Sequence, residues 1–251
     1  MTGPTDSAGT PWEGRDLKSN PFAGDDGSAD PALEAALGAY VTDDVGSLER
    51  VVHALAPARV LIPILAELEA AGAGVDGIVA DKEASAGVVA LEAPDGRRAL
   101  PVFTSVAAMA AWRADARPVP AMATRAALSA VSEDWALLVI DPAGPVTALV
   151  PRPAVWAIAR DRTWVPAVGA GGVVDPQVHL AIVAALTGVP HVGRVGTAPG
   201  RTSELAVVLG LDPGLDRPGL DAVLADVNAR LAAIDVVSER VDSLELRVGR
   251  A

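Results

Sequence analysis

Two charged clusters in the first half of the chain have residue types that could bind a ligand or a partner. Asp81, Lys82 and Glu83 form one of them, and Arg97 with Arg98 forms the other. A catalytic pair of carboxylates would need a second motif converging on the triplet, since adjacent strand residues point to opposite faces of a sheet. The triplet is therefore interpreted either as a solvated strand entrance or as a ligand or partner contact. The arginine pair either protects a strand edge or contacts an anion.

A third candidate is the hydroxyl pair Thr104 and Ser105, which precedes an apolar segment with helical spacing. A side-chain oxygen at this position caps the first free N–H groups of a helix. The same free N–H groups could instead hold an anion. The capping role is the simpler interpretation, and the three clusters together form our candidate interaction or ligand patch.

Other catalytic chemistry finds little support in the sequence. The chain has no cysteine, which excludes disulfides, thiolate nucleophiles and cysteine-ligated zinc. His53, His179 and His191 show no H-x-x-x-H or HExxH spacing. The glycines at 169–172 lack the Lys-Ser/Thr of a phosphate-binding loop. We therefore predict no catalytic, metal-binding or cofactor-binding residue and no cofactor.

The elements around the clusters follow a strand–turn–strand–helix pattern. Residues 88–91 form a β-branched apolar run, and the turn 94–96 (Pro-Asp-Gly) leads to a second strand at 99–103. Proline cannot donate to a strand ladder, so Pro101 predicts an edge strand or a bulge. A helix that ends near Trp112 follows.

A similar strand–turn–strand–helix unit recurs about 48 residues later. Its strands are predicted at 135–140 and 146–150, and its helix carries Trp156. Both tryptophans are predicted to be core residues of their helices. Two such ββα units arise either by structural duplication or by chance.

Three segments and one aromatic residue make the chain resemble the SseB family, which is named for an enhanced-serine-sensitivity phenotype. The most specific segment is Leu-Pro-Val-Phe-Thr-Ser, which ends at Ser105, and the similarity extends from about Asn20 to about Trp164. The full set is Ser19–Gly27, Asp81–Glu83, Ala99–Ser105 and Trp112. The resemblance implies an α/β domain in a cytoplasmic bacterial protein. It supplies no established catalytic residues.

Composition limits the partners. The chain has 251 residues, a hydrophobic share of 51% and a formal net charge of −12. The negative charge disfavours nucleic acid and anionic membrane surfaces, and fits a protein that meets basic protein surfaces. No segment has the pattern of a signal peptide or a membrane span. We therefore expect a cytoplasmic protein with no nucleic-acid binding and no membrane insertion.

Three regions are predicted along the chain. Residues 1–29 are polar and rich in Pro and Gly, and we expect a disordered acidic tail. Its Trp12 and Phe22 are candidate docking residues, for the protein's own surface or for a partner. An SseB-like domain is expected at 30–168, and a smaller α-β-β-α-β domain at 173–251. The glycine-rich segment 169–172 between them is interpreted as a linker.

The predicted fold class is α+β, with a mixed β-sheet flanked by helices, built from ββα-like units, and a smaller α/β C-terminal domain. The predicted function is a non-enzymatic protein-interaction or regulatory module, in which free strand edges could also pair two copies into a homodimer. The alternative is a sensor of a small, amino-acid-like metabolite whose carboxylate meets an arginine. A third hypothesis is a hydrolase or transferase assembled from scattered Ser, Asp and His residues.

Overall fold

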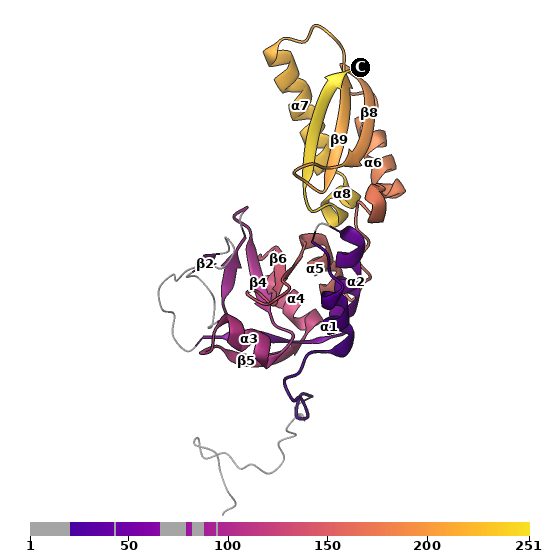
Figure 1. Ribbon diagram of the computed structural model, residues 1–251. Coiled ribbons are helices and arrows are strands. Elements are labelled where there is room, and N and C mark those ends of the chain that lie inside the picture. Colours follow the sequence, from indigo (N-terminus) through magenta and orange to yellow (C-terminus); the bar gives the residue numbers. More distant parts are fainter. Residues whose placement is uncertain (1–20, 43, 66–78, 82–87, 94) are drawn as a thin grey trace, which may run out of the picture.

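The computed structural model shows two lobes in sequence order (Figure 1). We call residues 21–164 the N-terminal lobe and residues 165–251 the C-terminal lobe. Helices and mixed sheets make up both, so the predicted α+β class is confirmed. The structure describes residues 21–42, 44–65, 79–81, 88–93 and 95–251. The tail residue Trp12 and the patch residues Lys82 and Glu83 lie outside these ranges.

The N-terminal lobe contains a five-stranded sheet in the order β2-β3-β4-β6-β7 and a two-stranded sheet of β1 and β5. Both predicted strand–strand–helix units are present, as β3-β4-α3 and β6-β7-α5, and the two units meet where β4 and β6 run parallel. The elements are α1 (Pro31–Gly38), α2 (Val45–Leu55), β1 (Arg59–Ile64), β2 (Val79–Asp81), β3 (Ala90–Glu92), β4 (Arg98–Val102), α3 (Val106–Trp112), β5 (Arg117–Met122), α4 (Ala123–Ser132), β6 (Leu137–Ile140), β7 (Ala148–Val150) and α5 (Arg152–Ala159).

The core of this lobe lies between the five-stranded sheet and helices α1, α2, α4 and α5. Leu100 and Ile140 on the central strands pack against buried Ala, Val and Leu side chains of these helices. Such a core suits a chain with only 3% aromatic residues. Trp112 is half-buried and packs on Phe103, with 5.3 Å between ring centroids. The expectation that Trp156 is a core residue is wrong: it is 37% exposed, with the Arg160 guanidinium 4.8 Å above its ring.

The strand prolines explain how the sheets end. Pro101 was expected at an edge or a bulge, but β4 lies inside the sheet between β3 and β6. Arg98 and Val102 accept hydrogen bonds from the β6 side, so the nitrogen of Pro101 points the opposite way. On that side β4 pairs with β3 only as far as Ala99, and then with β1 through Phe103. Pro101 therefore faces the gap between β3 and β1, where β4 has no strand partner. Proline is tolerated there because its missing N–H is not needed for a ladder hydrogen bond.

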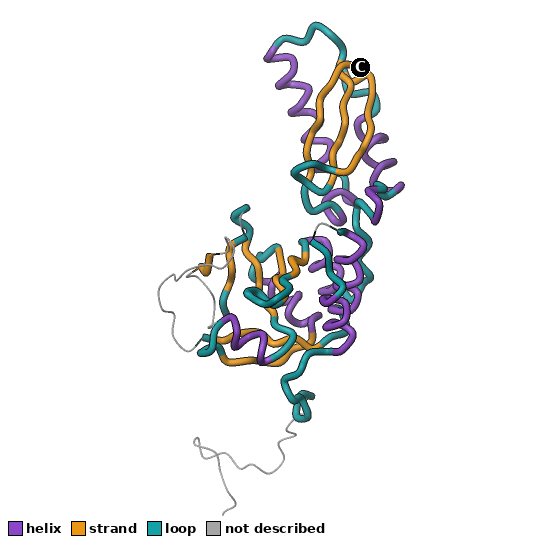
Figure 2. Tube along the Cα trace, in the orientation of Figure 1, coloured by secondary structure: helices purple, strands orange, loops and turns teal. Residues whose placement is uncertain are grey.

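The C-terminal lobe contains the α-β-β-α-β order expected from the sequence, together with two additional short helices, η2 and α8. Its three strands lie side by side in one sheet (Figure 2). The sheet has the order β10-β9-β8, with β8 antiparallel and β10 parallel to β9. Leu205, Leu209 and Val227 belong to its own buried apolar cluster. The elements are η2 (Ala170–Gly172), α6 (Pro176–Leu186), β8 (Val192–Pro199), β9 (Leu205–Leu211), α7 (Arg217–Ala232), α8 (Asp235–Arg240) and β10 (Leu244–Arg250).

A buried hydrogen-bonded pair joins the two strand–strand–helix units. Asp141 follows β6 and accepts two bonds from Thr104 after β4: 2.8 Å from the backbone N–H and 2.7 Å from the hydroxyl. Both residues are buried. Burial raises the pKa of Asp141, and the two bonds from Thr104 oppose that shift. The pair fixes the ends of two parallel strands that are adjacent in the sheet.

Replacing Asp141 by alanine should lower the free energy of unfolding by about 1–3 kcal/mol, because both Thr104 donors lose their acceptor inside the protein. Asp134→Ala is the matched control: Asp134 is exposed, and like Asp141 it has positive φ (58° against 47°). Denaturant unfolding of both variants separates the backbone cost from the lost hydrogen bonds. Equal losses of stability would show that the Thr104–Asp141 bonds contribute nothing.

Candidate ligand cleft between the two lobes

The structure separates the charged clusters that the sequence suggested as one patch. Asp81 on β2 pairs with Ala90 at the start of β3, whereas Arg98 on β4 pairs with Glu92 at its end. Arg97 follows the hairpin turn and is half-buried, engaged by two carboxylates. The described part of the patch thus lies on different strands at opposite ends of β3, and its ligand role stays a prediction.

The remaining predicted positions have structural contacts. Ser105 caps α3 by accepting the N–H of Ala108 at 3.1 Å, as expected, while Thr104 is occupied by Asp141. Near Phe22, Asp25 forms a 2.9 Å ion pair with Arg59 on β1. Residues 21–29, predicted as part of a disordered tail, are therefore anchored to the N-terminal lobe. Whether Phe22 docks to a partner stays a prediction.

Asp242, just before β10, receives hydrogen bonds from two separate parts of the N-terminal lobe. Its Oδ1 accepts from the Arg97 guanidinium at 2.8 Å and from the backbone N–H of Arg152, at the start of α5, at 3.1 Å. The Arg152 guanidinium also donates to the carbonyl of Val241 at 2.8 Å. A hairpin turn and a helix start are thereby fixed to the C-terminal lobe at one point.

Glu204 supports this junction from within the C-terminal lobe. Its carboxylate accepts the N–H of Asp242 at 2.7 Å and the N–H of Ala167 at 3.1 Å. Burial raises the pKa of Glu204, the nearby Asp242 carboxylate adds to the rise, and the two backbone bonds oppose it. A carboxylate with a perturbed pKa at a cleft is a candidate functional group.

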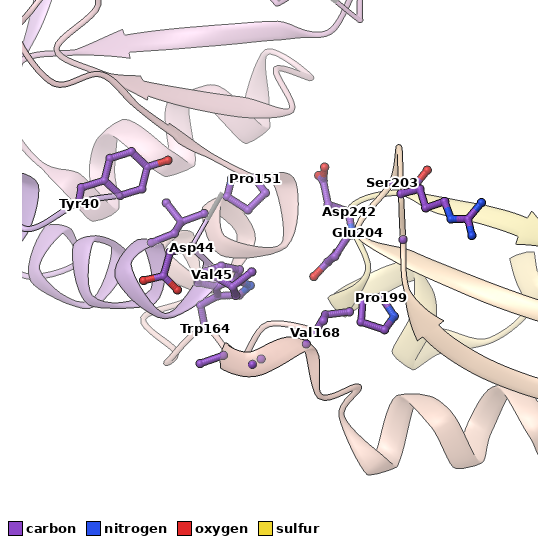
Figure 3. Close-up of a pocket in the computed structure, with 17 residues that line it drawn as sticks. Tyr40, Asp44, Val45, Pro151, Trp164, Val168, Pro199, Ser203, Glu204 and Asp242 are labelled. Carbon is purple, nitrogen blue, oxygen red and sulfur yellow. The ribbon is translucent and has the colours of Figure 1, made fainter. Parts of the chain in front are cut away.

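A cleft of about 570 Å³ opens between the lobes beside this junction. That volume lies within the range of small-molecule sites, which often form where two parts of a chain meet. The N-terminal lobe contributes Tyr40, Asp44 and Trp164, and the C-terminal lobe contributes Glu204 and Asp242. Figure 3 shows Glu204 extending toward the side of the cleft formed by Val45 and Trp164.

Three features of the lining bear on ligand binding. Three carboxylates from the two lobes and one guanidinium, that of Arg201, belong to residues of the lining, so acidic groups are in the majority. The indole Nε1 of Trp164 is buried without a hydrogen-bond partner. The segment 169–172, interpreted as a linker, contains the short helix η2 (Ala170–Gly172), and the N–H of Gly169 donates to the carbonyl of Val173 at 2.8 Å. This turn forms part of the cleft wall.

Sequence reasoning missed Glu204, Asp242 and Trp164. The two acids follow no motif, and their contacts cross 37 to 145 positions of the chain, from Ala167–Glu204 to Arg97–Asp242. The glycine run was the one local signal near the site. Of the three histidines, His179 contacts a hydroxyl, with 2.7 Å from Nδ1 to Thr197 Oγ1, and this pair does not line the cleft.

The geometry defines an α+β protein with two lobes, one built on a helix-flanked five-stranded mixed sheet and the other on a three-stranded sheet, and with a cleft between the lobes. Residues 33–157 match the family described as SseB protein N-terminal domain, which confirms the resemblance found in the sequence. The match includes Tyr40, Asp44 and Pro151 of the cleft and stops before the acids of the C-terminal lobe. Comparisons with curated proteins and with solved structures gave no match.

The described residues contain neither a helix that could span a membrane nor a cluster that could hold a metal ion. No helix there combines the length and the apolar character needed to cross a bilayer. Nor do three or more His, Asp or Glu side chains within those ranges converge on a point that could hold a metal ion.

Replacing Asp242 by alanine should lower the free energy of unfolding by about 1–3 kcal/mol, because two donors lose a largely buried acceptor. Asp95→Ala is the control, since Asp95 also pairs with Arg97 at 2.8 Å but its side chain is 51% exposed, against 13% for Asp242. The control should cost no more than about 0.5 kcal/mol. Chemical denaturation of both variants measures the two costs, and equal values would contradict the role given to Asp242.

Glu204→Gln should change how stability depends on pH. The folded-state pKa of Glu204 is raised above its ordinary 4.5, so the stability this group contributes is full below 4.5 and is lost as pH rises through the folded pKa. Melting temperatures should therefore shift in favour of the variant as pH rises. Glu245→Gln should show the opposite sign, because hydrogen bonds from Thr202 lower the pKa of Glu245 to about 2. Curves parallel to wild type would refute the assignment.

Proposed function

We propose that the protein is a non-enzymatic regulatory module that binds a small ligand carrying a cationic amino group in the cleft between its lobes. The observation that carries the proposal is the placement of carboxylates from both lobes on one cleft of ligand size: Asp44 from the N-terminal lobe, and Glu204 and Asp242 from the C-terminal lobe. A ligand that contacts both sides would change how the lobes are held, which suits a regulatory role.

Asp44 is the carboxylate with most remaining capacity for an ammonium group. It caps α2 through a 3.2 Å bond to the N–H of Gly46, and its nearest cation, Arg50, lies 4.0 Å away on the exposed surface. An ammonium group has three donors and pairs strongly with carboxylates. The aromatic rings of Tyr40 and Trp164 in the same lining offer apolar contacts for the rest of the ligand.

The choice of binding over catalysis rests on the contacts of Glu204. Its oxygens accept hydrogen bonds from the backbone N–H groups of Ala167 and Asp242. These bonds hold the carboxylate in place and give it a structural role. A general base would instead need a nucleophile within hydrogen-bond reach.

An amino acid is the amine that fits the metabolite-sensor hypothesis best. Arg201 is an exposed residue of the lining, and in the described part of the chain no carboxylate pairs with its guanidinium. It is available to a ligand carboxylate at the rim of the cleft. The cytoplasmic, bacterial setting remains part of the proposal, on the basis of the family resemblance.

The test is calorimetric titration of the protein with amino acids and with matched simple amines, preceded by native mass spectrometry of the fresh preparation. Asp44→Asn keeps the helix cap but removes the charge, and should weaken binding at least about tenfold. Arg201→Ala should weaken only ligands that carry a carboxylate. Arg217→Ala, on the exposed start of α7, is the control and should bind like wild type. Absence of heat from every amine, with a bare chain mass, would refute the proposal.

A further inference from the structure

The edge strand β8 of the C-terminal lobe has the features of a site for self-association. It is eight residues long and borders the three-stranded sheet on one side. The N–H of Gly200 donates to the carbonyl of Glu204, so by alternation Gly196 and Ala198 also face β9. The backbone groups of Val195 and Thr197 therefore point outward from the sheet.

Other described edges are less suited to strand addition. The bond from the N–H of Ala123 to the carbonyl of Ala58 sets the alternation in β5. It turns the nitrogens of Pro118 and Pro120 toward the free edge, where neither can donate. The edge strands β2 and β7 have three residues each. Across the C-terminal sheet, β10 carries Glu245, Arg247 and Arg250, whereas β8 carries a single charge on Arg194.

The surroundings of β8 suit a second copy of an acidic chain. The net charge of −12 makes most surfaces repel one another. Helix α6, which packs on β8 through the His179–Thr197 contact, has no Asp, Glu, Lys or Arg. One turn beyond His179, helical geometry places Val183 on the same side of α6, with Leu180, 65% exposed, beside it. An edge strand with a single charged residue, covered by a helix without charged residues, lets two copies approach.

We propose that two copies associate through β8, in antiparallel pairing about a two-fold axis at Gly196. In this register Val195 lies opposite Thr197 of the second copy, and the two outward residues of each strand exchange their hydrogen bonds. Arg194 then lies opposite Ala198, so the two arginines do not meet. The two sheets join into one continuous sheet, with helix α6 of each copy on the same face. This inference is independent of the ligand proposal.

The absence of cysteine makes cross-linking a direct test of the register. An added Cβ at Gly196 meets nothing within 4 Å in the single chain, and the same holds for Gly249 on β10. Two residues 196 facing each other as a non-hydrogen-bonded pair would bring their Cβ atoms into disulfide range. Under mild oxidation Gly196→Cys should form a covalent dimer, while Gly249→Cys, the matched control, should stay monomeric.

Sedimentation velocity over a range of concentrations tests the association itself. Wild type should show reversible dimerisation, and Val195→Pro, which removes an outward N–H and leaves the bonds to β9 in place, should sediment as a monomer. Circular dichroism checks that this variant folds; if it does not, the cysteine pair decides. A wild type that is monomeric throughout would overturn the proposal, as would a Gly196→Cys variant that cross-links no faster than Gly249→Cys.

Discussion

The bond network around Asp242 fixes the relation between the two lobes. One carboxylate holds the β3–β4 turn through Arg97 and the start of α5 through Arg152, and Glu204 holds the backbone of Asp242 in turn. Hydrogen bonds with a charged partner are shorter and stronger than neutral ones. The cleft forms because the two lobes are in contact at Asp242 and are separated next to this contact.

The same network gives the cleft its chemical character. Glu204 and Asp242 are already bound by backbone and arginine donors, so they are held in place before a ligand arrives. Fixed groups lose little entropy on binding, which favours affinity in a small site. The cost is a buried carboxylate whose pKa is raised by its surroundings. The proposed amine site and the junction between the two lobes therefore share the residues Glu204 and Asp242.

The two lobes differ in whether their strand edges carry outward-facing backbone N–H and C=O groups. In the N-terminal lobe, the nitrogens of Pro101, Pro118 and Pro120 face positions where no neighbouring strand is paired. Because proline has no N–H, no backbone donor is left without an acceptor at these positions. In the C-terminal lobe, β8 keeps outward-facing donors and acceptors over its regular part. Association through β8 would thus use the C-terminal lobe and none of the strands of the N-terminal lobe.

The sequence by itself determined the α+β class, the two ββα units, the cap at Ser105 and the α-β-β-α-β order of the C-terminal lobe, because these follow from local periodicity and turn chemistry. It also showed the resemblance to the SseB family, through the segment that ends at Ser105. The tertiary structure alone decided that β4 is central despite Pro101, that Trp156 is exposed, and that Asp44, Glu204 and Asp242 share a cleft. Those outcomes depend on which strands and lobes come together, and contacts between residues far apart in the chain leave no local pattern.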